Sequence, residues 1–117
     1  MVWKALNSEY VYYFSEGGES IPVFVCLMKL TDQGVKEIKN APKRIQEAVK
    51  NLEAMGGKLT AFYMVMGEYD YVGIAEVPSD EVAAAFLLGL GSSGFVRTTT
   101  LKAFTTEQLA AIVKKLP

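Results

Sequence analysis

Short, strongly apolar runs alternate along the chain with segments whose apolar residues recur every three or four positions. The runs cover residues 21–30, 59–66, 71–77 and 95–104. They are rich in β-branched and aromatic residues at consecutive positions, which is typical of strands buried on both faces. The pattern therefore predicts four strands, with one helix between the first and second and another between the third and fourth.

The first helical region carries clear start and stop signals. Thr31-Asp32 offers an N-cap for a short helical turn through Ile38. Pro42 suits the first turn of the main helix because its missing N–H costs nothing there, and Gly56-Gly57 should end that helix. The apolar face of this helix comprises Ile45, Val49, Leu52 and Met55, and the face predicted to meet water comprises Lys43, Arg44, Glu47 and Lys50.

The later helices differ in their polarity. Ser79 should cap the second helix, which is apolar nearly all round over residues 82–90. Such a helix needs cover on more than one side, from a C-terminal helix or from another subunit. Thr105 and Gln108 predict a capping box for a terminal helix. The buried stripe expected for that helix comprises Leu109, Ile112, Val113 and Leu116.

This order of elements indicates an α+β fold over residues 21–117, the ferredoxin-like split βαββαβ arrangement with a C-terminal helix. Right-handed crossovers would make the first and third strands central and place both helices on one face of the sheet. The opposite face would still carry apolar side chains. A second sheet from another subunit is the simplest cover for it, which predicts a dimeric α/β barrel.

Residues 1–20 form a separate N-terminal extension in composition. The segment holds one Lys and three Glu, and residues 10–14 have strong strand propensity. Residues 15–20 then break the pattern with turn-forming residues. Three interpretations stay open: an extra edge strand, an arm that contacts a neighbour, or a mobile extension.

Composition excludes several classes of protein. The chain has a net charge of −1, no histidine and one cysteine, Cys26. A nucleic-acid surface is therefore not expected, nor are zinc sites, haem held by histidine, or histidine-assisted nucleophiles. We expect no metal and no cofactor. No apolar run reaches the ~18 residues of a membrane span, and no signal peptide begins the chain, which predicts a soluble cytoplasmic protein.

The hydrophobic fraction also bears on assembly. Half of the 117 residues are hydrophobic, and the mean hydropathy is +0.19. A domain of this size has much surface for its volume, so part of its apolar area should be covered by a partner. We therefore expect a homodimer or a larger homo-oligomer.

The stretch Gly67-Glu68-Tyr69-Asp70 links the second and third strands in what should be a tight hairpin. Glycine adopts positive φ without penalty, and Asp can accept hydrogen bonds from nearby backbone. This hairpin lies in a series of motifs that resembles the GYD-domain proteins. The matching stretches are Leu30-Thr-Asp-Gln-Gly34, Pro42-Lys-Arg44, Met55-Gly-Gly-Lys58, Met66-Gly-Glu-Tyr-Asp70 and 94–104. The resemblance covers about residues 23–104 and implies a ferredoxin-like subunit that associates through its sheet, with no established activity.

The hairpin also looks like the effector-binding half of feast/famine transcription regulators, whose dimers bind amino acids. The helix-turn-helix of those regulators has no counterpart in this chain, so direct regulation by this chain alone is not expected. A second motif, residues 89–94, matches the dinucleotide-binding fingerprint as letters only. A helix precedes it and a strand follows, whereas a phosphate site needs the reverse order. We interpret it as a helix end and a turn.

Five residues are candidates for a ligand site: Lys58, Tyr63, Tyr69, Asp70 and Arg97. Asp70 either satisfies backbone donors at the hairpin or faces a ligand. Arg97 either pairs with a carboxylate, with Glu68, Asp70 and Glu76 as options, or binds an anionic ligand. Gly73 and Ala75, on the same strand face as Tyr69, could leave a cavity between sheets or simply admit bulky neighbours.

Three functions remain open from the sequence. The first is an oligomeric domain that binds a small organic ligand in a cleft between sheet and helices. The second is an enzyme that resembles the cofactor-free monooxygenases and isomerases built on the same dimeric barrel. Without histidine, its acid–base groups would be Tyr, Asp, Glu or Arg. The third is a structural assembly protein without a ligand.

Overall fold

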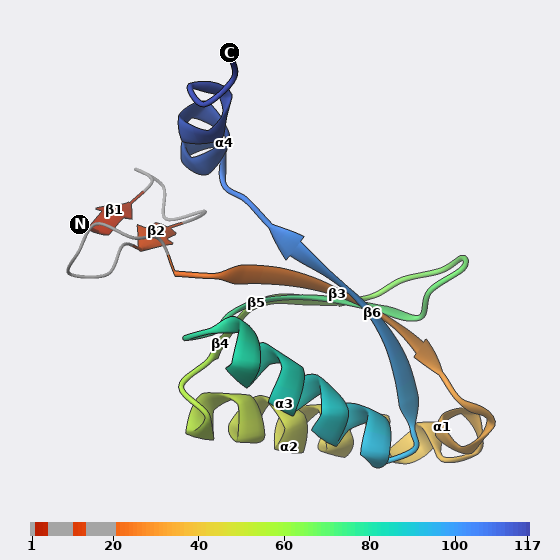
Figure 1. Cartoon of the computed structure of the whole chain (residues 1–117). Helices are drawn as coiled ribbons and strands as arrows, with labels where there is room; N and C mark the ends of the chain where they lie inside the picture. Colours follow the sequence, from red (N-terminus) through yellow and green to blue (C-terminus); the bar gives the residue numbers. More distant parts are fainter. Residues whose placement is uncertain (1, 5–10, 14–20) are drawn as a thin grey trace.

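A four-stranded antiparallel sheet forms the centre of the computed structural model, which describes residues 2–4, 11–13 and 21–117. The strand order is β4-β5-β3-β6, so that the first and third strands of the repeat are central, as predicted (Figure 1). The strands are β3 Val23–Leu30, β4 Lys58–Met64, β5 Tyr71–Glu76 and β6 Val96–Ala103. This topology confirms the ferredoxin-like α+β fold.

Two long helices lie together on one face of the sheet, and the terminal helix lies away from them, on the other side of the sheet (Figure 1). The helices are α1 Asp32–Lys36, α2 Ala41–Ala54, α3 Asp80–Ser92 and α4 Thr106–Val113, with a 3₁₀ turn over Ile38–Asn40. The first helical turn thus ends at Lys36 rather than continuing to Ile38 as predicted. At the N-terminus, β1 Val2–Lys4 pairs antiparallel with β2 Val11–Tyr13. The rest of the extension is outside the described residues, so its role stays a prediction.

The predicted caps are all present. The Thr31 and Ser79 hydroxyls accept hydrogen bonds from the N–H groups three residues further along, in α1 and α3. Thr105 and Gln108 form the reciprocal capping box of α4. Pro42 lies in the first turn of α2, and Gly56, at φ +90°, follows the end of that helix. Local sequence signals therefore explain where each helix begins or ends.

The buried core is small for a chain of this length. It centres on Leu52, Val77 and Ala83, against which Phe24 and Phe86 pack as partly buried neighbours. In the described part of the chain, no side chain is completely buried. The stripe of α4 that was predicted to be buried is exposed in the single chain, because α4 does not pack against the α2–α3 layer (Figure 1).

The sheet has a second face that α2 and α3 do not cover. Side chains alternate along a strand, and those that face the helices include Phe24 and Cys26 of β3 and Gly73 of β5. The intervening positions therefore point the other way. They include Val25, Leu27, Val72, Ile74 and, on β6, the half-exposed Leu101. This apolar face agrees with the predicted pattern of strands that are apolar on both sides.

Candidate functional site

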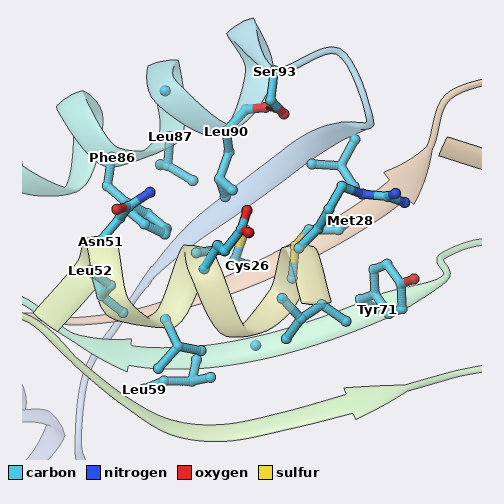
Figure 2. Close-up of a pocket in the computed structure, with 18 of the residues that line it drawn as sticks. Cys26, Met28, Asn51, Leu52, Leu59, Tyr71, Phe86, Leu87, Leu90 and Ser93 are labelled. Carbon is cyan, nitrogen blue, oxygen red and sulfur yellow. Dashed lines mark hydrogen bonds between the residues drawn. The ribbon is translucent and has the colours of Figure 1, made fainter. Parts of the chain in front are cut away.

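A cavity of about 900 Å³ lies between the sheet and the two helices α2 and α3. Its floor is the helix-facing side of the sheet, and its walls are the facing sides of the two helices (Figure 2). The lining is mainly apolar. Among the residues that contribute to it are Phe24, Met28, Leu52, Leu59, Phe62, Tyr71, Phe86 and Leu90. A cavity of this size and polarity is in the range that accommodates small organic ligands.

Small residues on β5 keep part of the cavity floor open. Gly73 pairs with Phe62 of β4, and a Cβ atom built on Gly73 would lie 3.6 Å from a ring carbon of Phe62 and 3.5 Å from the Met28 methyl. Ala75 lies on the same floor. The sequence left two interpretations of Gly73 and Ala75, a cavity or space for bulky neighbours. The structure contains features of both, since Gly73 admits the Phe62 ring and also faces a cavity. The cavity, however, lies between sheet and helices rather than between two sheets.

Cys26 and Thr100 supply polar atoms on the floor of the cavity. The Thr100 hydroxyl donates a hydrogen bond to Cys26 Sγ at 3.6 Å. Burial raises the pKa of the Cys26 thiol, and the hydrogen bond from Thr100 opposes this effect in part. At neutral pH Cys26 is therefore a thiol that packs as a small apolar side chain.

Arg44 contributes the guanidinium group of the cavity wall. Sequence reasoning placed Arg44 toward water, and this was wrong. Its guanidinium carbon lies 4.1 Å from the centroid of the Phe95 ring, and Nη1 donates to the carbonyl oxygen of Glu37 at 2.9 Å. The start of α2 lies against the start of β6, so the long Arg44 side chain covers the ring of Phe95 while its charge stays hydrogen-bonded.

Asp70 fastens the β4–β5 hairpin to the neighbouring strand. Its Oδ2 accepts a hydrogen bond from the backbone N–H of Leu30 at 2.8 Å, and its own N–H donates to the carbonyl oxygen of Met28 at 2.8 Å. The carbonyl of Asp70 accepts from the N–H of Val65, which closes the hairpin, and Gly67 has φ +125°. Asp70 thus satisfies a backbone donor, on β3 rather than within the hairpin itself.

Arg97 and Asp70 do not pair. Within residues 21–117, no ion pair joins Arg97 to Asp70, Glu68 or Glu76. The guanidinium of Arg97 instead donates to the carbonyl oxygens of Gly91 and Val96, both at 2.9 Å. Arg97 therefore ties the end of α3 to the start of β6.

The other candidate residues lie apart from the cavity. Lys29 lies over the ring of Tyr69, with 5.4 Å from Nζ to the centroid, and its Nζ is 3.8 Å from Glu68. Tyr63 is largely exposed on β4. Lys58 pairs in register with Glu76, and burial raises the pKa of the Glu76 carboxyl while the charge of Lys58 opposes the rise. None of the five candidates lines the cavity, so their role in ligand binding stays a prediction.

The residues that do line the cavity gave weak signals in the sequence. Alternation along β3 places Phe24, Cys26 and Met28 on the same face of that strand. In the same way, Tyr71 and Gly73 share one face of β5. This alternation does not indicate that the helices stand far enough from the sheet to leave a space. That spacing depends on contacts between distant segments.

No group of three or more Cys, Asp or Glu residues could hold a metal ion in the part of the chain that the structure describes. No helix there is long and apolar enough to cross a membrane.

The fold and the hairpin define the class of this protein: a small ferredoxin-like α+β domain whose Gly67–Asp70 hairpin is hydrogen-bonded to the central strand β3. The chain belongs to the GYD domain family, which matches residues 24–113. It is similar to the "glutamine synthetase and cystathionine beta-lyase binding protein" of Thermus thermophilus, with 37% identity over 95 residues. The aligned part covers 80% of this chain and 100% of that protein. No solved structure matches.

Proposed function

We propose that the protein is a homo-oligomeric binding domain whose cavity holds a small, mainly apolar organic ligand. The observation that carries the proposal is the cavity of about 900 Å³ between the sheet and α2–α3. Its apolar floor would bury the body of the ligand. The Thr100 hydroxyl, the Arg44 guanidinium and, at the mouth, Asn51 and Ser93 would supply hydrogen bonds that orient its polar part.

The oligomer rests on the uncovered face of the sheet. Val25, Leu27, Ile74 and Leu101 on that face are apolar, and a second copy packed through the same face would remove them from water. This is the dimeric α/β barrel expected from the sequence. Light scattering at micromolar concentration should give at least twice the chain mass. Leu101→Asp should shift the protein toward monomer, whereas Val35→Asp, at an exposed position of α1, should not. A well-folded wild-type monomer would contradict the proposal.

The ligand proposal is tested with a probe and with the purified protein itself. The probe is N-phenyl-1-naphthylamine, an uncharged apolar fluorophore that becomes bright in apolar surroundings. It should bind saturably to the wild type, and Ala48→Phe, which places a ring in the cavity wall, should abolish the signal. Ala111→Phe, the same change on the exposed surface of α4, should leave it unchanged. Native mass spectrometry should in addition show any co-purified small molecule. Equal probe binding by wild type and Ala48→Phe would refute the proposal.

A second function, the binding of another protein, is favoured by the name of the Thermus relative. The β4–β5 hairpin offers a surface for it, because Met66 is 93% exposed and Met64 is 74% exposed. Exposed methionines are common at adaptable binding surfaces. The test is biolayer interferometry with purified glutamine synthetase and cystathionine β-lyase from the organism that supplies the chain. We expect saturable binding to at least one enzyme, reduced by Met66→Asp and not by Val35→Asp. No binding to either enzyme would exclude this function.

A further inference from the structure

The charged residues that line the cavity gather at one of its ends. They are Glu37, Lys43, Arg44 and Glu47, which lie just before α2 or in its first half. Every other described residue in the lining is uncharged. The cavity therefore has a polar end, beside the start of α2, and an apolar end, beside the second half of that helix.

The two ends are separated by most of the length of α2. Leu52, Leu59 and Phe86 lie together at the apolar end, away from Met28 (Figure 2). Leu52 and Arg44 both line the cavity from α2. A helix rises about 1.5 Å per residue, so the levels of these two residues are about 12 Å apart. A molecule that extends along this helix would meet charged groups at one end and apolar side chains over the rest of its length.

Arg44 is a half-buried cation at the polar end of the cavity. Its guanidinium lies over the ring of Phe95, and Nη1 donates to the carbonyl oxygen of Glu37. Within residues 21–117, no carboxylate forms an ion pair with Arg44. Charged groups that are partly removed from water are usually paired. A guanidinium has five N–H donors, so Arg44 can bind a further acceptor without losing its contact with Glu37.

The surroundings of Arg44 favour a single negative charge. The first turn of α2 holds Lys43 and Arg44 and no acidic residue, and the helix dipole adds to their positive charge there. Glu37 and Glu47 also line this end, so its formal charges sum to about zero. A doubly charged head such as a phosphate monoester would be repelled by both carboxylates, whereas a singly charged head can pair with the Arg44 guanidinium alone.

We propose that the ligand of the cavity is an amphipathic monocarboxylate, whose carboxylate pairs with the Arg44 guanidinium while its apolar body extends along α2 toward Leu52. The inference rests on the proposed ligand-binding function and specifies the class of ligand. The planar guanidinium matches a carboxylate with two parallel hydrogen bonds, and such charge-assisted bonds are stronger than neutral ones. Stacking on Phe95 would hold the guanidinium in place for this contact.

A series of compounds with one apolar body and different head groups tests the class of ligand. Displacement of N-phenyl-1-naphthylamine from the wild type at neutral pH is measured with decanoate, decanol, decylamine and decyl phosphate. We expect decanoate to bind about tenfold more tightly than decanol, because only decanoate forms the charge-assisted pair. Tighter binding of decylamine or decyl phosphate than of decanoate would overturn the carboxylate assignment.

Substitutions in α2 test the role of Arg44. Arg44→Gln should remove the preference for decanoate over decanol, and Arg44→Lys, which keeps the charge without the planar fork, should retain part of it. Glu47→Gln removes a neighbouring negative charge and should strengthen decanoate binding without changing decanol binding. The matched control is Lys50→Gln, at an exposed cation of the same helix outside the cavity lining, which should leave the preference unchanged.

The outcomes separate this inference from the proposed function. Saturable binding of the fluorophore with equal affinities for decanoate and decanol would overturn the monocarboxylate and leave the apolar cavity site standing. An unchanged preference in Arg44→Gln would overturn the assignment of Arg44. If Arg44→Gln does not fold, the decanoate preference of Glu47→Gln decides, since no increase there would contradict the inference. No binding of the fluorophore to the wild type would refute both proposals.

Discussion

Replacing Gly34 by Ala should destabilise the fold, although alanine is normally the better residue in a helix. Gly34 is buried in α1, directly against the backbone at the start of β6. A Cβ atom at this position would overlap the carbonyl oxygen of Phe95 and lie 2.9 Å from a methyl group of Leu30. The carbonyl belongs to the backbone and cannot rotate away, so α1 and β6 would have to move apart.

The magnitude follows from what that movement disrupts. Overpacking of a close contact costs about 1–3 kcal/mol. The same carbonyl of Phe95 accepts the N–H of Thr31 at 3.0 Å, and the Thr31 hydroxyl donates to the carbonyl of Gly94 at 2.5 Å. Loss of one such hydrogen bond adds about 1 kcal/mol. The higher helix propensity of alanine relative to glycine offsets at most about 1 kcal/mol of this loss. The net loss should be about 1–3 kcal/mol.

Gly89→Ala is the matched control. Gly89 is also helical, but a Cβ atom there would have no atom within 4 Å. That change should stabilise the protein by about 0.5–1 kcal/mol, since glycine weakens a helix interior. Urea unfolding of both variants, at one protein concentration because oligomers unfold in a concentration-dependent way, measures the difference. Equal or greater stability of Gly34→Ala relative to the wild type would refute the close-contact argument.

Three further changes test other contacts of the fold. Asp70→Asn keeps an acceptor for the Leu30 N–H and should change the free energy of unfolding by about 1 kcal/mol or less. Asp70→Ala leaves that N–H without its acceptor and should cost about 1–3 kcal/mol. Similar losses for the two variants in urea unfolding would contradict the role assigned to the Asp70 carboxylate. Phe86→Ala should lower the free energy of unfolding by about 2–3 kcal/mol. This is less than the usual loss for a core aromatic, because the Phe86 ring also borders the cavity. A loss under about 0.5 kcal/mol would place the ring outside the core. Glu76→Gln concerns pH: burial raises the pKa of this carboxyl in the folded state above its ordinary 4.5, so its ionisation destabilises the fold as the pH rises through that region. The Gln variant should lose this contribution, and an unchanged dependence of melting temperature on pH would contradict it.

The elements of the fold could be predicted because their signals are local. Pro42, Ser79 and the Thr105–Gln108 pair act within one helical turn, and each begins a helix where expected. Apolar runs likewise marked the four strands to within a few residues. The order of strands in the sheet followed from the handedness of the crossovers, which is nearly invariant.

The site was harder to predict because its contacts join distant segments. Asp70 accepts from Leu30, which is 40 residues away, and Arg44 covers the ring of Phe95. The residues next to Asp70 and Arg44 in the sequence do not indicate which distant residue each of them contacts. Periodicity similarly showed that α4 has an apolar face, but a stripe is the same pattern whether its own chain or a second one covers it.

Cys26 gives the cavity a built-in chemical reporter. It is the chain's one cysteine and it faces the cavity floor, so a thiol reagent will mark this position alone. Because burial raises its pKa, the rate of alkylation should be low at neutral pH and increase as the solution becomes more alkaline. Reagents of increasing size would then measure how wide the mouth between α2 and α3 opens. A molecule bound in the cavity would slow alkylation by shielding the Cys26 sulfur. The alkylation rate would therefore report how much of the wild-type protein has its cavity occupied, without any substitution in the chain.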